Sequence, residues 1–553
     1  MPTKAPCLTS VTSRICNLST HDGSSASRGP RASVENRLLR VRSLLTAGDL
    51  PGARAISDSI LAEHPGDAGA LIQRSRLESM DDNYRVAREY ALSACRVGVR
   101  NKRQCMFLLR RLKTFNLIPE LHGFIPRIPQ ELLQDVDVAQ LVALFLQTLN
   151  KPQLALHHLQ LADTHNPSSA PLKSDIGVAL LNLGRFEEAE QHFRESLDLQ
   201  PDHASAWWHL SRLHEKGGAD ADQVEALKHA IARATDPGNV ALLAYALHRE
   251  LDSLGDHPGA TDALEQACTS MRKVVAYSGE EDERLFALLK SLPTEAGHDS
   301  GKADAPFTPV FIVGMHRSGT TLLEQLLSGH TDICSGGELY DFTSQLRLAA
   351  DHHCSTELDA QIVQASPDFD YEAIGRGYLE SVDWRRSAGE RFVTDKLPSN
   401  FLNIGFILRA LPGAKILHMS RDPMETCFSN LREPFSGTTC RYSYDQAELA
   451  NYYRQYFALM QHWRQRFPGR IHDVTYAALA TDPAAELKRV MAYLGTGFQP
   501  AMLDPQSSTG SVTKASAVQV RQKPGLPLRP KWHAYRDYLT PLAWRLSELG
   551  QRY

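Results

Sequence analysis

Turn-forming residues recur every 34 positions through the first half of the chain. They are Gly48, Asp82, Asn116, Asn150, Gly184 and Gly218. Glycine, asparagine and aspartate tolerate the left-handed backbone conformation that ends one helix and lets the chain reverse into the next. A fixed period of this length indicates an array in which each unit buries its apolar face only against its neighbours. The pattern therefore predicts an all-helical repeat domain.

The clearest repeat unit lies between Asp175 and Pro201. We expect a first helix over 175–184 and a second over 185–201. The second helix carries one apolar stripe, made of Phe186, Ala189, Phe193 and Leu197. This helix-turn-helix unit resembles the tetratricopeptide repeat, and a generic helical bundle with accidental spacing is the alternative. The resemblance implies either a concave surface that recruits a peptide or protein acceptor, or a brace for the second half of the chain.

The chain is long enough, at 553 residues, to hold more than one core. Residues 1–35 are rich in Ser, Thr, Arg and Gly and predict a disordered tail, with an organellar transit peptide as the alternative. The repeats are expected over 36–291. A polar linker rich in Gly, Pro and Asp follows over 292–308, and a second domain over 309–553.

Charge and composition exclude several classes of partner. The formal net charge of −4 lacks the basic excess of nucleic-acid-binding domains. No apolar run approaches the roughly 18 to 20 residues of a membrane-spanning helix. Nine scattered cysteines without paired spacing predict reduced thiols and a cytoplasmic protein. A homodimer is left open.

A phosphate-binding loop is predicted at the start of the second domain. An apolar run at 309–313 suits a buried parallel strand, and GMHRSGTT follows it from Gly314 to Thr321, before a helical pattern. Strand, glycine loop and helix together direct backbone N–H groups at a phosphate. Compared with the loop of nucleotide triphosphatases, Thr320 replaces the lysine that neutralises the β and γ phosphates. Arg317 is then the loop's cation.

A second anion-binding motif lies a hundred residues further along. A strand is expected over 415–420, then a turn that contains Arg421, and then a helix that contains Ser429. Arginine offers a planar fork of donors to phosphate oxygens, and a serine hydroxyl can add another donor.

The two motifs together resemble those of the sulfotransferase superfamily, over roughly Pro309 to Tyr538. The similarity is greatest to the tyrosylprotein-sulfotransferase branch and its bacterial relatives fused to tetratricopeptide repeats. It implies an α/β fold, with a parallel sheet flanked by helices on both faces and nucleotide at the carboxyl ends of the strands. It also implies 3′-phosphoadenosine 5′-phosphosulfate (PAPS) as co-substrate and no metal.

The same resemblance implies roles for individual residues. The catalytic set is Glu338 as general base, Arg317 and Lys396 as stabilisers of transferring charge, and Ser516 near the leaving phosphate. The cofactor-binding set is Arg317, Ser318, Gly319, Thr320, Thr321, Arg421, Ser429, Tyr476 and Lys531. His316 and His330 are rival bases. The branch has a further cofactor arginine about twelve residues after Arg421, where this chain has Glu433 preceded by Arg432.

The sequence therefore predicts in-line transfer of a sulfuryl group to an acceptor hydroxyl. The resemblance favours a protein tyrosine as acceptor, and a carbohydrate or a small phenol needs the same machinery. Two alternatives of other classes are a P-loop kinase or ATPase and a non-catalytic repeat scaffold.

Overall fold

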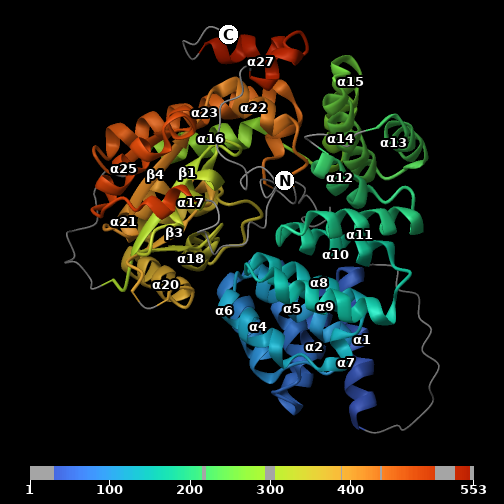
Figure 1. The fold of residues 1–553 in the computed structure, drawn as a ribbon. Helices are drawn as coiled ribbons and strands as arrows, with labels where there is room; N and C mark the ends of the chain where they lie inside the picture. The colour runs from blue at the N-terminus through green and yellow to red at the C-terminus, as the bar shows by residue number, and fades with distance from the viewer. Residues whose placement is uncertain are drawn as a thin grey trace.

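The computed structural model describes residues 30–214, 220–292, 305–387, 389–435, 439–504 and 530–548. It consists of an all-helical region followed by a domain built on a five-stranded sheet (Figure 1). Helix α1 begins at Pro30, inside the segment for which the sequence predicts a disordered tail. Most of that tail and of the expected linker, and the predicted site residue Ser516, lie outside the described residues.

Antiparallel helix pairs fill the N-terminal region. Its helices are α1 (Pro30–Ala47), α2 (Leu50–Glu63), α3 (Ala68–Met80), α4 (Tyr84–Val97), α5 (Lys102–Thr114), α6 (Ile118–Phe124), α7 (Gln130–Leu133), α8 (Val136–Thr148), α9 (Pro152–His165), α10 (Ala170–Asn182), α11 (Phe186–Leu199), α12 (Ala204–Leu213), α13 (Ala221–Arg233), α14 (Pro237–Leu254), α15 (His257–Val274) and α16 (Gly279–Lys290). The two helices expected between Asp175 and Pro201 are α10 and α11.

The residues spaced by 34 lie at the turns between these helices, as predicted. Gly48, Asp82, Asn116, Asn150 and Gly184 all have a positive φ, between 51° and 78°. Gly218 lies outside the described residues. The recurring left-handed turn thus sets the period of the array.

Helices α10 and α11 approach each other closely because small residues lie between them. A Cβ atom added to Gly177 of α10 would lie 2.5 Å from the ring of Phe193 on α11. Phe193 and Ala189 are both fully buried at this contact. The apolar stripe predicted for the second helix therefore faces the first helix of the same unit.

All five strands of the C-terminal domain are parallel. They are β1 (Thr308–Gly314), β2 (Ile333–Ser335), β3 (Phe392–Asp395), β4 (Lys415–Ser420) and β5 (Ile471–Thr475), and their order in the sheet is β2-β3-β1-β4-β5. In the register of the central strand, Val310 pairs with Thr394 of β3 on one side and with Lys415 of β4 on the other.

Helices cover both faces of the sheet, as the resemblance implies. The helices of this domain are α17 (Thr320–Leu327), α18 (Asp341–Ala350), α19 (Ala360–Ala365), α20 (Tyr371–Asp383), α21 (Ile404–Ala410), α22 (Pro423–Leu431), α23 (Gln446–Arg466), α24 (Tyr476–Thr481), α25 (Pro483–Leu494) and α27 (Thr540–Ser547), with short 3₁₀ helices η5 (Pro398–Asn403), η6 (Arg441–Tyr444) and η8 (Lys531–Tyr535). Val310 and Ile312 of β1 pack in one apolar cluster with α17 and α25. Phe311 faces the opposite way, against Phe342 of α18 and Tyr378 of α20.

The helices that follow β1 and β4 lie on opposite faces. Leu323 of α17 belongs to the cluster on one face, and Met424 of α22 belongs to the cluster on the other. A crevice forms in open parallel sheets where neighbouring connections diverge in this way. The gap between the ends of β1 and β4 is therefore the expected ligand site.

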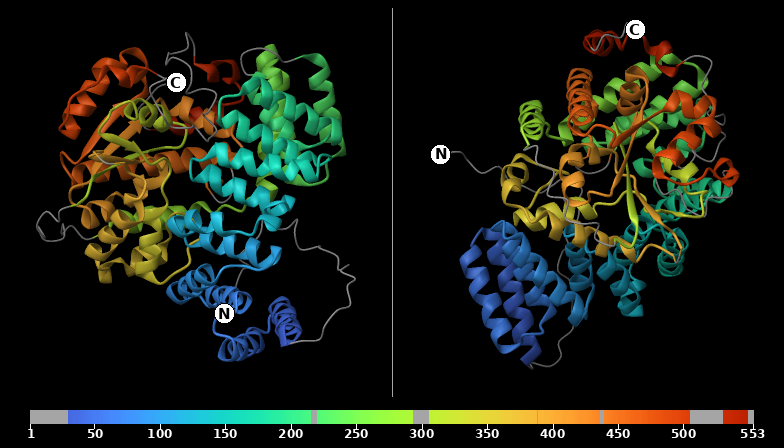
Figure 2. Two further views of the ribbon diagram at one scale, coloured as in Figure 1. Left: turned by 60° about the horizontal axis from the view of Figure 1, so that its bottom comes forward. Right: turned by 90° about the vertical axis from the view of Figure 1, so that its left-hand side faces the viewer.

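The helical region runs along one side of the α/β domain (Figures 1 and 2). Several of its helices contact that domain. His352 after α18 bonds Asp82 at the turn before α4. Arg432 after α22 donates to Asp252 of α14 at 2.6 Å. Helix α16 packs on α19 and α23 of the α/β domain. Within the described ranges, no helix is long and apolar enough to cross a membrane.

Candidate active site

Within three residues of its end, each strand of the sheet is followed by a residue that the sequence predicts for the site. Lys396, Arg421 and Tyr476 are the first residues after β3, β4 and β5, and Arg317 and Glu338 lie three residues after β1 and β2. Because the carboxyl ends of parallel strands share one edge of the sheet, these five side chains gather at that edge.

The loop between β1 and α17 is shaped to hold an anion. Gly314 and Gly319 have positive φ values, and a Cβ at Gly314 would lie 2.4 Å from the Met419 carbonyl oxygen. Arg317 also has a left-handed conformation, with φ of 68°, which is strained for a residue with a long side chain. The Ser318 hydroxyl is buried and has no hydrogen-bond partner among the described residues. An uncompensated buried hydroxyl in a loop at a helix N-terminus fits a phosphate ligand.

The two anion-binding motifs meet directly. Arg317 Nε donates a hydrogen bond to Ser429 Oγ at 3.1 Å, across 112 residues of sequence. The ring of Tyr476 also links the two motifs. It packs on Gly319 of the loop, and the Arg421 guanidinium lies 4.5 Å from the ring centroid. Arg421 Nε donates to Glu425 Oε2, in the first turn of α22, at 3.0 Å. Both arginines thus belong to one site.

Glu338 and Lys396 form an ion pair at the same edge of the sheet. Lys396 Nζ donates to Glu338 Oε1 at 2.8 Å, and the Lys396 amide donates to the Gly337 carbonyl, also at 2.8 Å. Burial alone would lower the pKa of Lys396, but the Glu338 and Glu324 carboxylates outweigh it and raise that pKa. The lysine therefore stays charged, and it can stabilise a departing anion.

Comparisons with known proteins identify a family for each of the two regions. The sulfotransferase family matches residues 309–500, and a tetratricopeptide-repeat family matches residues 174–239. The chain is a tetratricopeptide-repeat region followed by a sulfotransferase domain.

The relatives of the chain are distant. An uncharacterised protein of Aquifex aeolicus (strain VF5) is 26% identical over 73% of this chain and 54% of its own length. The protein-tyrosine sulfotransferase of Drosophila melanogaster is 22% identical over 52% of this chain and 58% of its own length. The chain thus spans little more than half the length of these two relatives.

Part of the chain is also similar to a solved structure. It is the sulfotransferase domain of the Synechococcus PCC 7002 olefin synthase, at 20% identity and a TM-score of 0.29, and the match covers 45% of this chain and 96% of that one.

Three buried residues that support the candidate site were not predicted from the sequence. Glu324 of α17 accepts hydrogen bonds from Thr394 Oγ1 and from the Gly337 amide, both at 2.9 Å, and so fixes the loop that carries Glu338. Asp395 accepts bonds from Tyr378 and Asn400, and its burial raises its pKa well above the usual range. These contacts join elements far apart in sequence, and no local pattern signals them.

Three other residues predicted to bind the cofactor differ in their burial. Thr320, where a triphosphatase has its lysine, is the buried first residue of α17, and Thr321 beside it is partly buried. The exposed Lys531 opens η8 and lies within electrostatic range of Asp252 on α14.

The two rival histidines are both bonded in the structure. Both nitrogens of His330 are bonded to backbone, to the Gly497 carbonyl and the Asp332 amide, which suits a structural role. The Nδ1 atom of His316 lies 3.3 Å from the Tyr442 hydroxyl.

Glu433 occupies the position at which the tyrosylprotein-sulfotransferase branch has a cofactor arginine, and the structure shows where Glu433 and the neighbouring Arg432 lie. Arg432 turns away from the site and bonds His248 and Asp252 of the repeat helix α14. Glu433 lies 4.0 Å from Arg317 and 3.5 Å from Arg249, which also belongs to α14. The arginine next to the expected position therefore joins the two regions of the chain, and an acidic group lies beside the loop arginine.

Proposed function

We propose that this protein transfers a sulfuryl group from PAPS to an acceptor hydroxyl. The observation that carries the proposal is the direct contact of Arg317 with Ser429, with Tyr476 packed on both motifs. Two anion-binding segments that meet at one sheet edge suit a ligand with phosphates at both ends. The chemistry of the residues fits that ligand: two arginines, an unpartnered buried hydroxyl, and a helix N-terminus.

Each residue then has a definite part in binding. The backbone of 318–321 and the Ser318 hydroxyl hold the 5′-phosphate, and Arg421 and Ser429 hold the 3′-phosphate. Tyr476 supports Arg421 through its ring. Arg317 bonds Ser429 in this structure, so a bound nucleotide competes for that hydrogen bond. Ser516 and Lys531 would complete the cover of the nucleotide.

When bound, PAPS supplies the sulfuryl group and leaves as the 3′,5′-bisphosphate. Lys396 Nζ donates a hydrogen bond to the Glu338 carboxylate and so holds it in position, and Glu338 takes the proton of the acceptor hydroxyl. The new bond joins the acceptor oxygen to sulfur, while the bond between sulfur and the bridging oxygen breaks. Arg317 and Lys396 stabilise the charge that develops on the transferring and departing oxygens.

Among acceptors, the similarity to the Drosophila protein-tyrosine sulfotransferase supports a protein tyrosine. The repeats would then recruit the peptide or protein that carries it. A sugar or a small phenol remains the alternative, because the same base and cations serve any hydroxyl.

Titration calorimetry with PAPS and with ATP–Mg²⁺ separates this function from that of a P-loop kinase. We expect PAPS to bind in the micromolar range and ATP–Mg²⁺ to bind at least tenfold more weakly, because Thr320 replaces the lysine that a γ-phosphate needs. Tighter binding of ATP–Mg²⁺ would favour the kinase, and binding of neither would favour the non-catalytic scaffold.

A further inference from the structure

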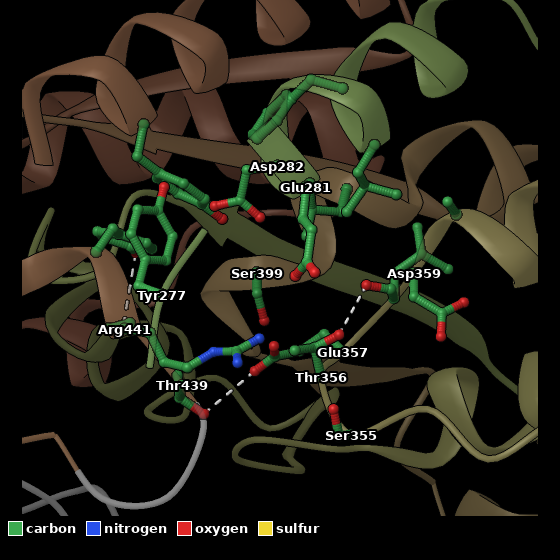
Figure 3. Close-up of a pocket in the computed structure, with 18 of the residues that line it drawn as sticks. Tyr277, Glu281, Asp282, Ser355, Thr356, Glu357, Asp359, Ser399, Thr439 and Arg441 are labelled. Atoms are coloured by element: carbon green, nitrogen blue, oxygen red, sulfur yellow. Dashed lines mark hydrogen bonds between the residues drawn. The ribbon is translucent and has the colours of Figure 1, made fainter. Parts of the chain in front are cut away.

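A cavity of about 430 Å³ lies between the last repeat helix and the sulfotransferase domain (Figure 3). Helix α16 supplies one wall, residues 355–361 another, and the segments around Ser399 and η6 the rest. His316 of the phosphate loop also lines it. The hydroxyl of Tyr442, another lining residue, lies 3.3 Å from the Nδ1 atom of His316. The cavity is therefore next to the catalytic centre.

Carboxylates point into this cavity from two separate elements. Glu281 and Asp282 come from α16, and Glu357 comes from the segment before α19 (Figure 3). Burial raises the pKa of Asp282 to about 6, and burial also raises the pKa of Glu357. The Arg441 guanidinium acts on both of these carboxyl groups. A single guanidinium cannot balance the charge of two buried carboxylates. The cavity therefore favours the binding of a further cation.

The other charged residues that line the cavity do not cancel this excess of negative charge. Arg284 is exposed at the rim, and Asp359 bonds His352 Nε2 at 2.8 Å. Tyr277 and Thr439 supply neutral hydrogen bonds, the first to Asp282 and the second to Glu357.

The aromatic side chains and the buried hydroxyl that line the cavity suit an aromatic ligand with a hydroxyl group. Phe286, Tyr442 and Tyr452 line it, and the last two rings stack at 3.6 Å. The Ser399 side chain is 3% exposed, points into the cavity, and its hydroxyl has no partner among the described residues (Figure 3). Ser399 lies three residues after Lys396. An unpaired buried hydroxyl at this depth is available to a polar group of a ligand.

We propose that this cavity is the acceptor site and that it selects a phenol or alcohol that carries a protonated amine close to the hydroxyl. The proposal rests on the sulfuryl-transfer function proposed above. The carboxylates from α16 and from residue 357 pair with the ammonium, the aromatic walls hold the ring, and the hydroxyl is directed toward Glu338. The last helix of the repeat region thus contributes directly to acceptor choice.

Three small phenols of one skeleton test the charge preference: tyramine (a cation), tyrosol (neutral) and 4-hydroxyphenylacetate (an anion). Their binding to the full chain is measured by calorimetry, with and without adenosine 3′,5′-bisphosphate. A charge-assisted hydrogen bond contributes about tenfold or more in affinity. We expect tyramine to bind at least tenfold more tightly than both analogues. Equal or weaker binding of tyramine, or no binding of any of the three, overturns the proposal.

Two variants test whether the carboxylates of the cavity cause the preference for tyramine. The double variant Asp282→Asn, Glu357→Gln should reduce the tyramine preference to less than threefold, while Glu283→Gln on the exposed face of α16 should leave it unchanged. A preference that survives in the double variant places the cation elsewhere and overturns the proposal. The tripeptides Lys-Tyr-Lys and Glu-Tyr-Glu distinguish a peptide source of the ammonium from a free amine.

The two proposals fail in different ways. If PAPS binds and tyramine has no advantage, only the acceptor inference is wrong. If PAPS does not bind, the sulfuryl-transfer function is wrong, whatever the phenols do.

Discussion

Single residues at the strand ends carry most of the proposed chemistry. Lys396, Arg421 and Tyr476 each follow their strand without an intervening residue, so the rigid sheet fixes their positions. Glu338 is placed differently, on a loop held by the Glu324 carboxylate and the Gly337 backbone. A base held by buried hydrogen bonds loses little entropy when it engages the acceptor.

The variant Glu338→Gln tests the proposed base. Glutamine keeps the shape of the side chain but cannot accept the hydroxyl proton, so turnover should fall by about 10²-fold or more. PAPS affinity, measured by calorimetry, should change by less than about threefold, because Glu338 is not placed among the phosphate-binding groups. The exposed Glu372→Gln on α20 is the control. Normal turnover in the Glu338 variant would remove this residue from the mechanism.

At the scale of helices and strands, the sequence predicted the structure best. The spacing of turn residues predicted the reversals at Asp82, Asn116 and Gly184, because each is a local requirement for a left-handed backbone. The expected strand at 415–420 coincides with β4. The apolar run at 309–313 likewise lies within β1, because such a run suits a buried parallel strand.

Contacts between distant elements could not be predicted in the same way. Nothing around Glu324 indicates that it fixes the Glu338 loop, and nothing around Asp282 indicates that α16 lines a cavity of the next domain. The direction of Arg432 toward α14 also depends on how the two regions pack. Such placements follow from tertiary structure, which one sequence pattern does not encode.

The close approach of α10 and α11 is testable with two glycine variants. Gly177→Ala forces a Cβ against the Phe193 ring and should lower the free energy of unfolding by about 1–3 kcal/mol. Gly123→Ala in α6 meets open space and should be neutral or raise it by up to about 1 kcal/mol. Urea denaturation of both variants measures the difference. Equal effects would show that the helices do not approach as described.

At the scale of the whole molecule, ion pairs join the repeat region to the sulfotransferase domain. Asp82 pairs with His352, Asp252 pairs with Arg432, and Arg272 of α15 pairs with Glu448 of α23. Tyr535 of η8 also bonds Asp252, so the C-terminal segment is attached to the same repeat helix. These contacts support a bracing role for the repeats, alongside their contribution of α16 to the cavity.

The first of these contacts should make stability depend on pH. Burial lowers the pKa of His352, but bonds to Asp82 and Asp359 outweigh it and raise that pKa above its ordinary value. A raised folded-state pKa stabilises the protein below the unfolded value of about 6.5, and this contribution is lost as the pH rises through the folded value.

The variant Asp82→Asn retains a residue that tolerates the left-handed turn but removes the charge. Thermal denaturation should show a loss of about 0.5–1 kcal/mol at pH 6 and a smaller loss at pH 9. The exposed Asp262→Asn is the charge control. A loss that is the same at both pH values would mean that the His352 charge does not take part.

The central claim is that the segments of Arg317 and Arg421 hold two ends of one nucleotide. It is tested most directly by measuring, in the wild type and in Arg421→Ala, the affinities for PAPS and for adenosine 5′-phosphosulfate, which lacks the 3′-phosphate. The account predicts that the variant loses roughly 1.5–3 kcal/mol of PAPS binding and none of adenosine 5′-phosphosulfate binding. A preference for PAPS that persists undiminished in Arg421→Ala would contradict it.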